Sequence, residues 1–153
     1  MARQIFLIVV GKLKDSNLEA IELDYLKRIN NPELIIHEVK ASAENKEAEG
    51  EVILKKIRDI SQGGPTHLVA MSEWGKQSTS VNFAQWCRDL FERPVKVFFI
   101  IAGAEGFSEE ILKNCQERIS LSGLTFPHKL ARILLVEQLY RAQTIRTGHP
   151  YHN

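Results

Sequence analysis

The 153-residue sequence has only two cysteines, and no motif brings them together. Cys87 and Cys115 fall in segments whose apolar spacing predicts helices, and neither belongs to a C-x-x-C pair. Such sparse cysteine favours buried thiols in a reducing compartment over a disulfide framework. A redox pair or a nucleophilic cysteine is the alternative interpretation.

Long apolar runs are also missing. The run Ile5 to Val10 near the start ends at Gly11-Lys12 without the small-residue cleavage site of a signal peptide, so it suits a buried strand better. No stretch approaches the roughly 20 apolar residues that a membrane-spanning helix needs. We therefore expect a cytoplasmic protein without membrane contact.

The chain also lacks a strong charge of either sign, because its formal net charge is only +1. It can attract nucleic acid only through a local basic patch. The candidate is the segment from Pro127 to Asn153, which could hold RNA phosphate and stack on bases. A solvated helix face with a frayed tail is the alternative. The segment contains Lys129, Arg132, Arg141 and Arg146 against a single Glu137, together with His128, Tyr140, His149, Tyr151 and His152.

No repeat or linker divides the chain, so we expect one domain over residues 1–153. Short apolar runs alternate with helical patterns, which indicates an open, mostly parallel α/β sheet with helices on both faces. Strands are expected at 4–10, 34–39, 67–72, 95–101 and 118–121. The run at 95–101 is apolar except for Lys96, as in a central strand covered on both faces.

Five helices are expected between these strands. The first begins with a capping box at Ser16 and places Leu18, Ile21, Tyr25 and Ile29 on one face. The others are marked by Ile53, Ile57 and Ile60, by the amphipathic pattern Phe83 to Phe91, by a cap at Ser108, and by the span His128 to Arg146. Glu73 to Ser80 is interpreted as a polar loop.

In open α/β sheets, ligands bind at the carboxyl ends of the strands, here the loops after Met71, Ile101 and Leu121. The glycines between Ile101 and Gly106 permit close approach of a ligand, but they match neither a dinucleotide fingerprint nor a P-loop. No Lys or Arg lies between Ile101 and Glu110, so a cofactor without phosphate, such as S-adenosylmethionine, fits better than a nucleotide. A tight strand-to-helix turn is the alternative. The segment Leu121 to Pro127 could wrap an adenine ring or be an ordinary connection.

The expected last helix is apolar around most of its circumference. A helix of this kind should be buried on every side, whereas a terminal helix has the sheet on one face only. A homodimer would cover the other face. The residues concerned are Leu130, Ile133, Leu134, Leu135, Val136 and Leu139.

Three runs in this part of the chain resemble the RlmH family of the SPOUT superfamily. They are Leu124 to Arg132 (LTFPHKLAR), Glu137 to Ala142 (EQLYRA) and His149 to His152 (HPYH). Val10 to Lys14 and Gly75-Lys76 also look like family positions, and the resemblance covers essentially the whole chain. That family methylates N3 of pseudouridine in bacterial large-subunit ribosomal RNA.

The resemblance implies a trefoil-knotted α/β fold, an obligate homodimer and S-adenosylmethionine bound in the knot, with no metal ion. The implied cofactor contacts are Met71, Gly103, Leu121, Ser122, Gly123, Leu124, Thr125 and Phe126. The implied substrate is pseudouridine 1915 (bacterial numbering) in helix 69 of 23S ribosomal RNA, in the assembled ribosome. One departure from the family is Ala102, where the family usually has the first glycine of Ile-Gly-Gly-x-x-Gly. Alanine is costly there if the position needs positive φ.

N3 of pseudouridine must lose a proton before it is methylated. His128 or His152 could accept this proton, or Arg132 or Arg141 could favour the imide anion. Tyr151 is a candidate for stacking on the base. His128 could instead cap the last helix, and His152 could contact only phosphate. The rival functions are a non-catalytic ribosome-binding factor with the same fold and a small dinucleotide-binding module.

Overall fold

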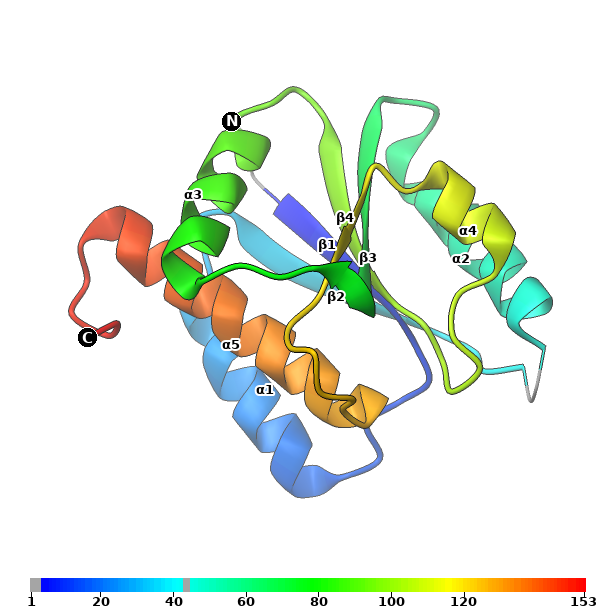
Figure 1. Ribbon diagram of the computed structural model, residues 1–153, viewed down its shortest axis with the longest axis horizontal. Helices are drawn as coiled ribbons and strands as arrows, with labels where there is room; N and C mark the ends of the chain where they lie inside the picture. The colour runs from blue at the N-terminus through cyan, green and yellow to red at the C-terminus, as the bar shows by residue number, and fades with distance from the viewer. Residues whose placement is uncertain (1–3, 43–44) are drawn as a thin grey trace.

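A computed structural model describes residues 4–42 and 45–153 and forms a single sheet flanked by helices (Figure 1). The strands are β1 (Gln4–Val10), β2 (Glu33–Val39), β3 (Thr66–Lys76), β4 (Lys96–Ile101) and β5 (Glu117–Ile119). The helices are α1 (Ser16–Arg28), α2 (Lys46–Ser61), α3 (Ser80–Phe91), α4 (Glu109–Asn114) and α5 (His128–Thr147).

The sheet has the order β2-β1-β4-β3-β5, and every neighbouring pair of strands is parallel. The expected open α/β sheet is confirmed, and so is the central place of β4. Alternate residues of a strand point to opposite faces. Ile5, Leu7 and Val9 therefore pack with α1, α3 and α5, whereas Phe6 and Ile8 pack with α2 and α4 (Figure 1). The trefoil knot that the resemblance implies stays a prediction.

Helix α1 differs from its sequence pattern at both the cap and the buried face. Asp15, rather than Ser16, caps the helix, since its Oδ1 accepts hydrogen bonds from the backbone N of Asn17 and of Leu18 at 2.9 and 3.0 Å. Ile21 was expected on the buried face but is 45% exposed, while Glu22 is only 6% exposed. The helix is turned so that Glu22 meets a partner on α5.

Strand β3 is longer than expected, so the polar-loop interpretation is wrong for Glu73 to Lys76. Met71 and Lys76 both pair with Ile119 of β5, and the residues between them form a bulge, Ser72–Gly75, at the carboxyl end of the sheet. Strand β5 in turn covers Glu117–Ile119 instead of 118–121. Bulges of this kind re-aim side chains and are common beside functional sites.

Both cysteine side chains contact a hydrophobic core of the protein. Cys87 is fully buried, and burial raises the pKa of its thiol far above the ordinary range. Burial also raises the pKa of the half-buried Cys115 to about 11. Neither thiol is therefore ionised near pH 7, which excludes a thiolate nucleophile.

Among the helices described, none is long and apolar enough to cross a membrane.

Candidate active site

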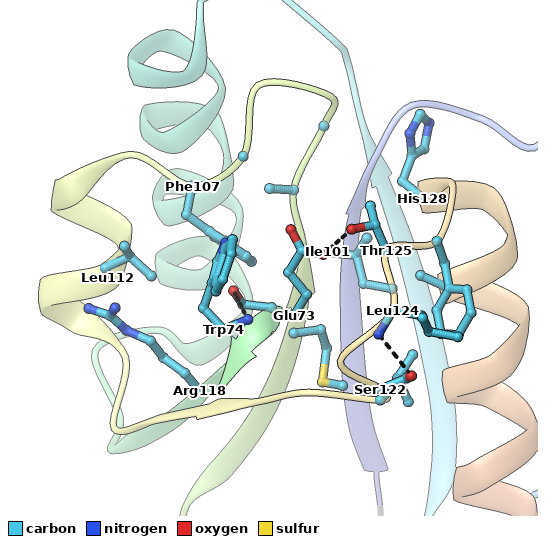
Figure 2. Close-up of a pocket in the computed structure, with 18 residues that line it drawn as sticks. Glu73, Trp74, Ile101, Phe107, Leu112, Arg118, Ser122, Leu124, Thr125 and His128 are labelled. Carbon is cyan, nitrogen blue, oxygen red and sulfur yellow. Dashed lines mark hydrogen bonds between the residues drawn. The ribbon is translucent and has the colours of Figure 1, made fainter. Parts of the chain in front are cut away.

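The three loops that sequence reasoning selected come together around one cavity of about 400 Å³, here called the main cavity (Figure 2). One wall comes from the end of β3 and its bulge, a second from the loop that follows β4, and a third from the segment between β5 and α5. The cavity therefore lies at the carboxyl edge of the parallel sheet, where open α/β folds bind ligands.

Most residues expected to contact a cofactor line this cavity. They are Met71, Gly103, Leu121, Ser122, Leu124, Thr125 and Phe126. Gly123 is not among the lining residues. It is exposed, and a Cβ built on it would meet Gln77 Nε2 at 3.3 Å, outside the cavity.

Gly103 is required by close packing. A Cβ on Gly103 would lie 2.9 Å from Oε1 of Glu49 and 3.2 Å from Cγ1 of Val10. Glu49 is only 7% exposed, and its other oxygen accepts a hydrogen bond from the backbone N of Ser42 at 2.9 Å. One oxygen of the carboxylate is thus held by Ser42, and a side chain at 103 would have to displace either Glu49 or the loop that lines the cavity.

The replacement of the family's first glycine by Ala102 carries no backbone cost. Ala102 is not among the residues with positive φ, whereas Gly106 has φ +81° and does need glycine. Ala102 lines the cavity beside Gly103. The loop therefore keeps its geometry despite the substitution.

The segment between β5 and α5 is ordered by short hydrogen bonds to serine. Ser120 Oγ donates to the Ser122 carbonyl at 2.6 Å, and Ser122 Oγ accepts from the backbone N of Leu124 at 3.0 Å. Thr125 Oγ1 donates to the Glu73 carboxylate, which ties this segment to the bulge on the opposite wall (Figure 2). The two walls are therefore linked across the cavity mouth.

His128 is the one histidine among the predicted catalytic residues that lines the main cavity. It is the first residue of α5, and the preceding Pro127 makes no side-chain capping bond. The imidazole makes no hydrogen bond within residues 4–42 and 45–153, so the helix-capping interpretation finds no contact to support it. Figure 2 places His128 on the α5 side of the cavity, near Thr125.

Arg132 does not reach the main cavity. Its side chain is buried, with Nε and Nη2 bonded to the Glu22 carboxylate at 2.6 and 2.8 Å and Nη1 bonded to Glu38 at 2.7 Å. Burial alone would lower the pKa of the guanidinium, but the two carboxylates outweigh it and raise that pKa. Arg132 joins α5 to α1 and β2, a structural role that differs from the predicted catalytic one.

Arg141, Tyr151 and His152 form a second cluster at the far end of α5, with the tail His149–Asn153 folded back on the helix. Arg141 lies over the Tyr151 ring at 4.8 Å, and its Nη1 is 2.9 Å from Nδ1 of His152. Thirteen residues separate Arg141 from His128, about 20 Å along the helix axis. Within one chain the structure therefore brings Arg141, Tyr151 and His152 together but leaves them remote from His128.

Hydrogen bonds connect the members of this cluster. A guanidinium can only donate, so Nδ1 of His152 is the acceptor in its contact with Arg141. The hydroxyls of Tyr151 and Tyr25 are 3.3 Å apart, and this bond together with burial raises the pKa of Tyr151 to about 12. The phenol therefore stays protonated near pH 7. Arg141 also forms an ion pair with Glu137 at 2.8 Å, which reduces the positive charge that this segment can offer to RNA.

Sequence reasoning missed several lining residues, chiefly Glu73, Trp74, Phe107 and Arg118. A tryptophan in a stretch interpreted as a polar loop was the one signal that could have drawn attention to the bulge. Arg118 carried no signal, because it sits on a short edge strand. Within the residues that the structure describes, no group of three or more His, Cys, Asp or Glu could hold a metal ion.

Residues 3–152 match a family model described as "Predicted SPOUT methyltransferase", so the chain belongs to the SPOUT methyltransferases. Two structures support the fold. A probable methylase family protein from Haemophilus influenzae has a TM-score of 0.57 at 12% identity, over 96% of this chain and 67% of that one. AviRb from Streptomyces viridochromogenes, solved with AdoMet, has a TM-score of 0.53 at 13% identity; the match covers 94% of this chain but only 59% of that one.

Relatives with higher sequence identity show which family of SPOUT methyltransferases the chain belongs to. The chain is 38% identical to ribosomal RNA large subunit methyltransferase H of Flavobacterium johnsoniae, over 97% of this chain and 98% of that protein. Identity to the protein of the same name from Prochlorococcus marinus is 41%, over 95% and 94% of the two chains. At this identity and coverage the chain is a member of the ribosomal RNA large subunit methyltransferase H (RlmH) family, as the resemblance implied.

Proposed function

We propose that this protein uses S-adenosylmethionine to methylate N3 of a pseudouridine in 23S ribosomal RNA, at position 1915 in the assembled ribosome, in the cytoplasm. The main cavity supports this most directly, because the three loops expected to hold the cofactor line it in a member of the RlmH family. The rival docking factor rested on Ala102 alone, and the ordinary backbone at that residue removes its support.

The residues of the main cavity fit this cofactor. Its volume of about 400 Å³ lies within the usual range for small-molecule sites. Met71, Ile101 and Leu121 supply apolar walls for an adenine ring, and the loop at Gly103 lets backbone approach closely. When bound, the cofactor supplies an electrophilic methyl group, and the residues of the chain position the acceptor.

Cations at the carboxyl edge of the sheet suit an RNA substrate. Lys12 and Lys14 follow β1, and Lys40 follows β2, so all three lie at the carboxyl edge of the sheet. None of them forms an ion pair within residues 4–42 and 45–153. Free lysines at this edge would attract the phosphate backbone while the chain as a whole stays nearly neutral.

His128 is the candidate acceptor for the N3 proton, because its exposed imidazole lines the cavity and has no competing bond in the described residues. A neutral imidazole is available near pH 7 to accept a proton. Arg141 and Tyr151 could contribute only from a second subunit, given their distance from the cavity of their own chain.

A homodimer would complete the site. Leu130 and Leu134, one turn apart on α5, are 44% and 39% exposed, whereas Leu135 and Val136 are fully buried. The exposed pair leaves an apolar stripe on the helix that begins at the cavity. An isologous interface along this stripe would bury it and would place the tail of one subunit beside the cavity of the other.

The decisive test supplies purified protein with S-adenosylmethionine and with ribosomes that lack this methylation. We expect saturable cofactor binding by calorimetry and one added methyl group on a pseudouridine by mass spectrometry. Absence of cofactor heat would favour the docking factor. A methyl group on a different base would reassign the substrate.

A substitution at Gly103 should separate cofactor binding from folding. We expect Gly103→Val to weaken S-adenosylmethionine binding by at least about tenfold, because its side chain would clash with Glu49 and Val10 and displace the loop that lines the cavity. Gly123→Ala is the matched control, since Gly123 lies in a neighbouring loop but outside the cavity lining. Calorimetry on both variants measures the effect, and equal affinities would remove Gly103 from the cofactor site.

A further inference from the structure

Trp74 has the most exposed large apolar side chain among the residues that the structure describes. It is 85% exposed, whereas the second tryptophan, Trp86, is partly buried and donates a hydrogen bond to Glu117 at 2.9 Å. Trp74 also lines the main cavity, in the loop after Met71, but the resemblance does not assign it a cofactor contact. An aromatic side chain in this position is available to a ligand that approaches from solvent.

The bulge Ser72–Gly75 holds Trp74 in this outward position. A Cβ on Gly75 would lie 2.6 Å from the backbone of Arg118 and Ile119, so the bulge packs directly against β5. The backbone N of Trp74 donates to Ser72 Oγ at 3.3 Å, and Glu73 is bonded to Thr125 across the cavity. The bulge is therefore anchored on both sides of Trp74, and the exposed indole is not the tip of a loose loop.

A cation lies on the same side of the cavity. Arg118 is exposed and lines the main cavity, and its guanidinium makes no hydrogen bond or ion pair within the described parts of the chain. Figure 2 draws Trp74, Phe107, Leu112 and Arg118 together on the α4 side, facing Leu124 and His128 on the α5 side. An exposed indole and a free guanidinium that line the same cavity suit an unpaired nucleotide, whose base stacks on the ring while its phosphate meets the cation.

We propose that Trp74 and Arg118 form a stacking platform for an unpaired nucleotide of the RNA substrate, at the rim of the main cavity. This inference rests on the proposed function and adds a substrate contact by residues that are not among the expected cofactor contacts. Trp74 is a substrate-positioning residue in this scheme. The indole ring stacks on one base and thereby fixes the position of the RNA strand. The neighbouring target base can then enter the cavity toward His128.

The test compares Trp74→Ala and Trp74→Phe with the unmodified protein. Co-sedimentation measures binding to ribosomes that lack the methylation, and steady-state assays give KM and kcat. We expect Trp74→Ala to raise both the dissociation constant and KM for ribosomes by about 5- to 150-fold, the range for loss of one stacked base. Trp74→Phe should restore most of the affinity, because it keeps an aromatic face.

Arg118→Gln should act through charge. We expect it to weaken ribosome binding and to reduce the slope of log affinity against log salt concentration by about one, as for one phosphate contact. Calorimetry with S-adenosylmethionine should show a smaller loss of cofactor affinity than of ribosome affinity in all three variants.

The outcomes separate this inference from the proposed function. Ribosome binding unchanged in Trp74→Ala would overturn the platform, even if methylation is observed. If Trp74→Ala lost cofactor affinity as strongly as ribosome affinity, the indole would instead contact the adenine of the cofactor. If light scattering showed that the variant had become monomeric, the indole would belong to a subunit interface. Failure of the unmodified protein to methylate would overturn the proposed function, while co-sedimentation would still test the platform.

Discussion

Replacing Arg132 with alanine is expected to lower the free energy of unfolding by about 3–5 kcal/mol, because it leaves a buried carboxylate without a partner. Glu22 is 6% exposed, and both of its carboxylate oxygens accept from Arg132. Removal of the guanidinium leaves the negative charge of Glu22 unpaired in the interface between α1 and α5. The effect should be among the largest that a single substitution causes in this chain.

Urea denaturation followed by circular dichroism would measure this loss. Arg132→Met retains much of the apolar stem, so a similar loss in both variants would attribute the effect to the charge and not to packing. Arg141→Ala is the matched control on the same helix. Its ion pair with Glu137 is more exposed, and its loss should cost no more than about 1 kcal/mol. Equal losses at 132 and 141 would contradict the special role of the buried pair.

Deletion of the tail His149–Asn153 is expected to reduce methyl transfer by about a hundredfold or more, although the tail is remote from the main cavity of its own chain. Its aromatic and basic residues would act in the cavity of the partner. Cofactor binding should persist in the truncated protein, because the residues that line the cavity are all retained. Calorimetry and the ribosome assay together would separate the two effects.

A mixture of two impaired variants, assayed at a cofactor concentration too low for Gly103→Val to bind it, would test the shared site. One variant lacks the tail, and the other carries Gly103→Val in an otherwise complete chain. Random reassociation makes half of the dimers mixed, each with one intact cavity facing one intact tail, so about a quarter of full activity should return. Mixed dimers confirmed by mass spectrometry without recovered activity would place the tail and cavity of one chain in the same site.

The sheet could be predicted from sequence because its signals are local. β1 and β4 are continuous apolar runs, and only a strand buried on both faces requires such a run. Met71 and the loops after Ile101 and Leu121 followed from the rule that ligands bind at the carboxyl edge, and the structure brings them together.

The buried ion pair could not be predicted, since its partners are separated by 110 positions in the sequence. Arg132 resembled a basic residue available to RNA, and Glu22 interrupted the apolar face of α1 without an obvious cause. Only the packing of α5 across α1 brings the two charges together. The bulge also depends on a contact between distant segments and was missed for that reason. Residues Ser72–Gly75 do not alternate between the two faces as a regular strand does, and the strand pairs again with Ile119 of β5 only at Lys76.

The order of the strands affects how the nascent chain must behave during its own synthesis. β1 is translated first, yet its second neighbour, β4, begins only at Lys96, and α5, which covers one face of the sheet, is translated last. Until then only α1 and α3 cover that apolar face and Glu22 has no counter-charge, so incomplete chains are prone to aggregation and proteolysis. This chain therefore reaches its native state only after α5 has left the ribosome that translates it.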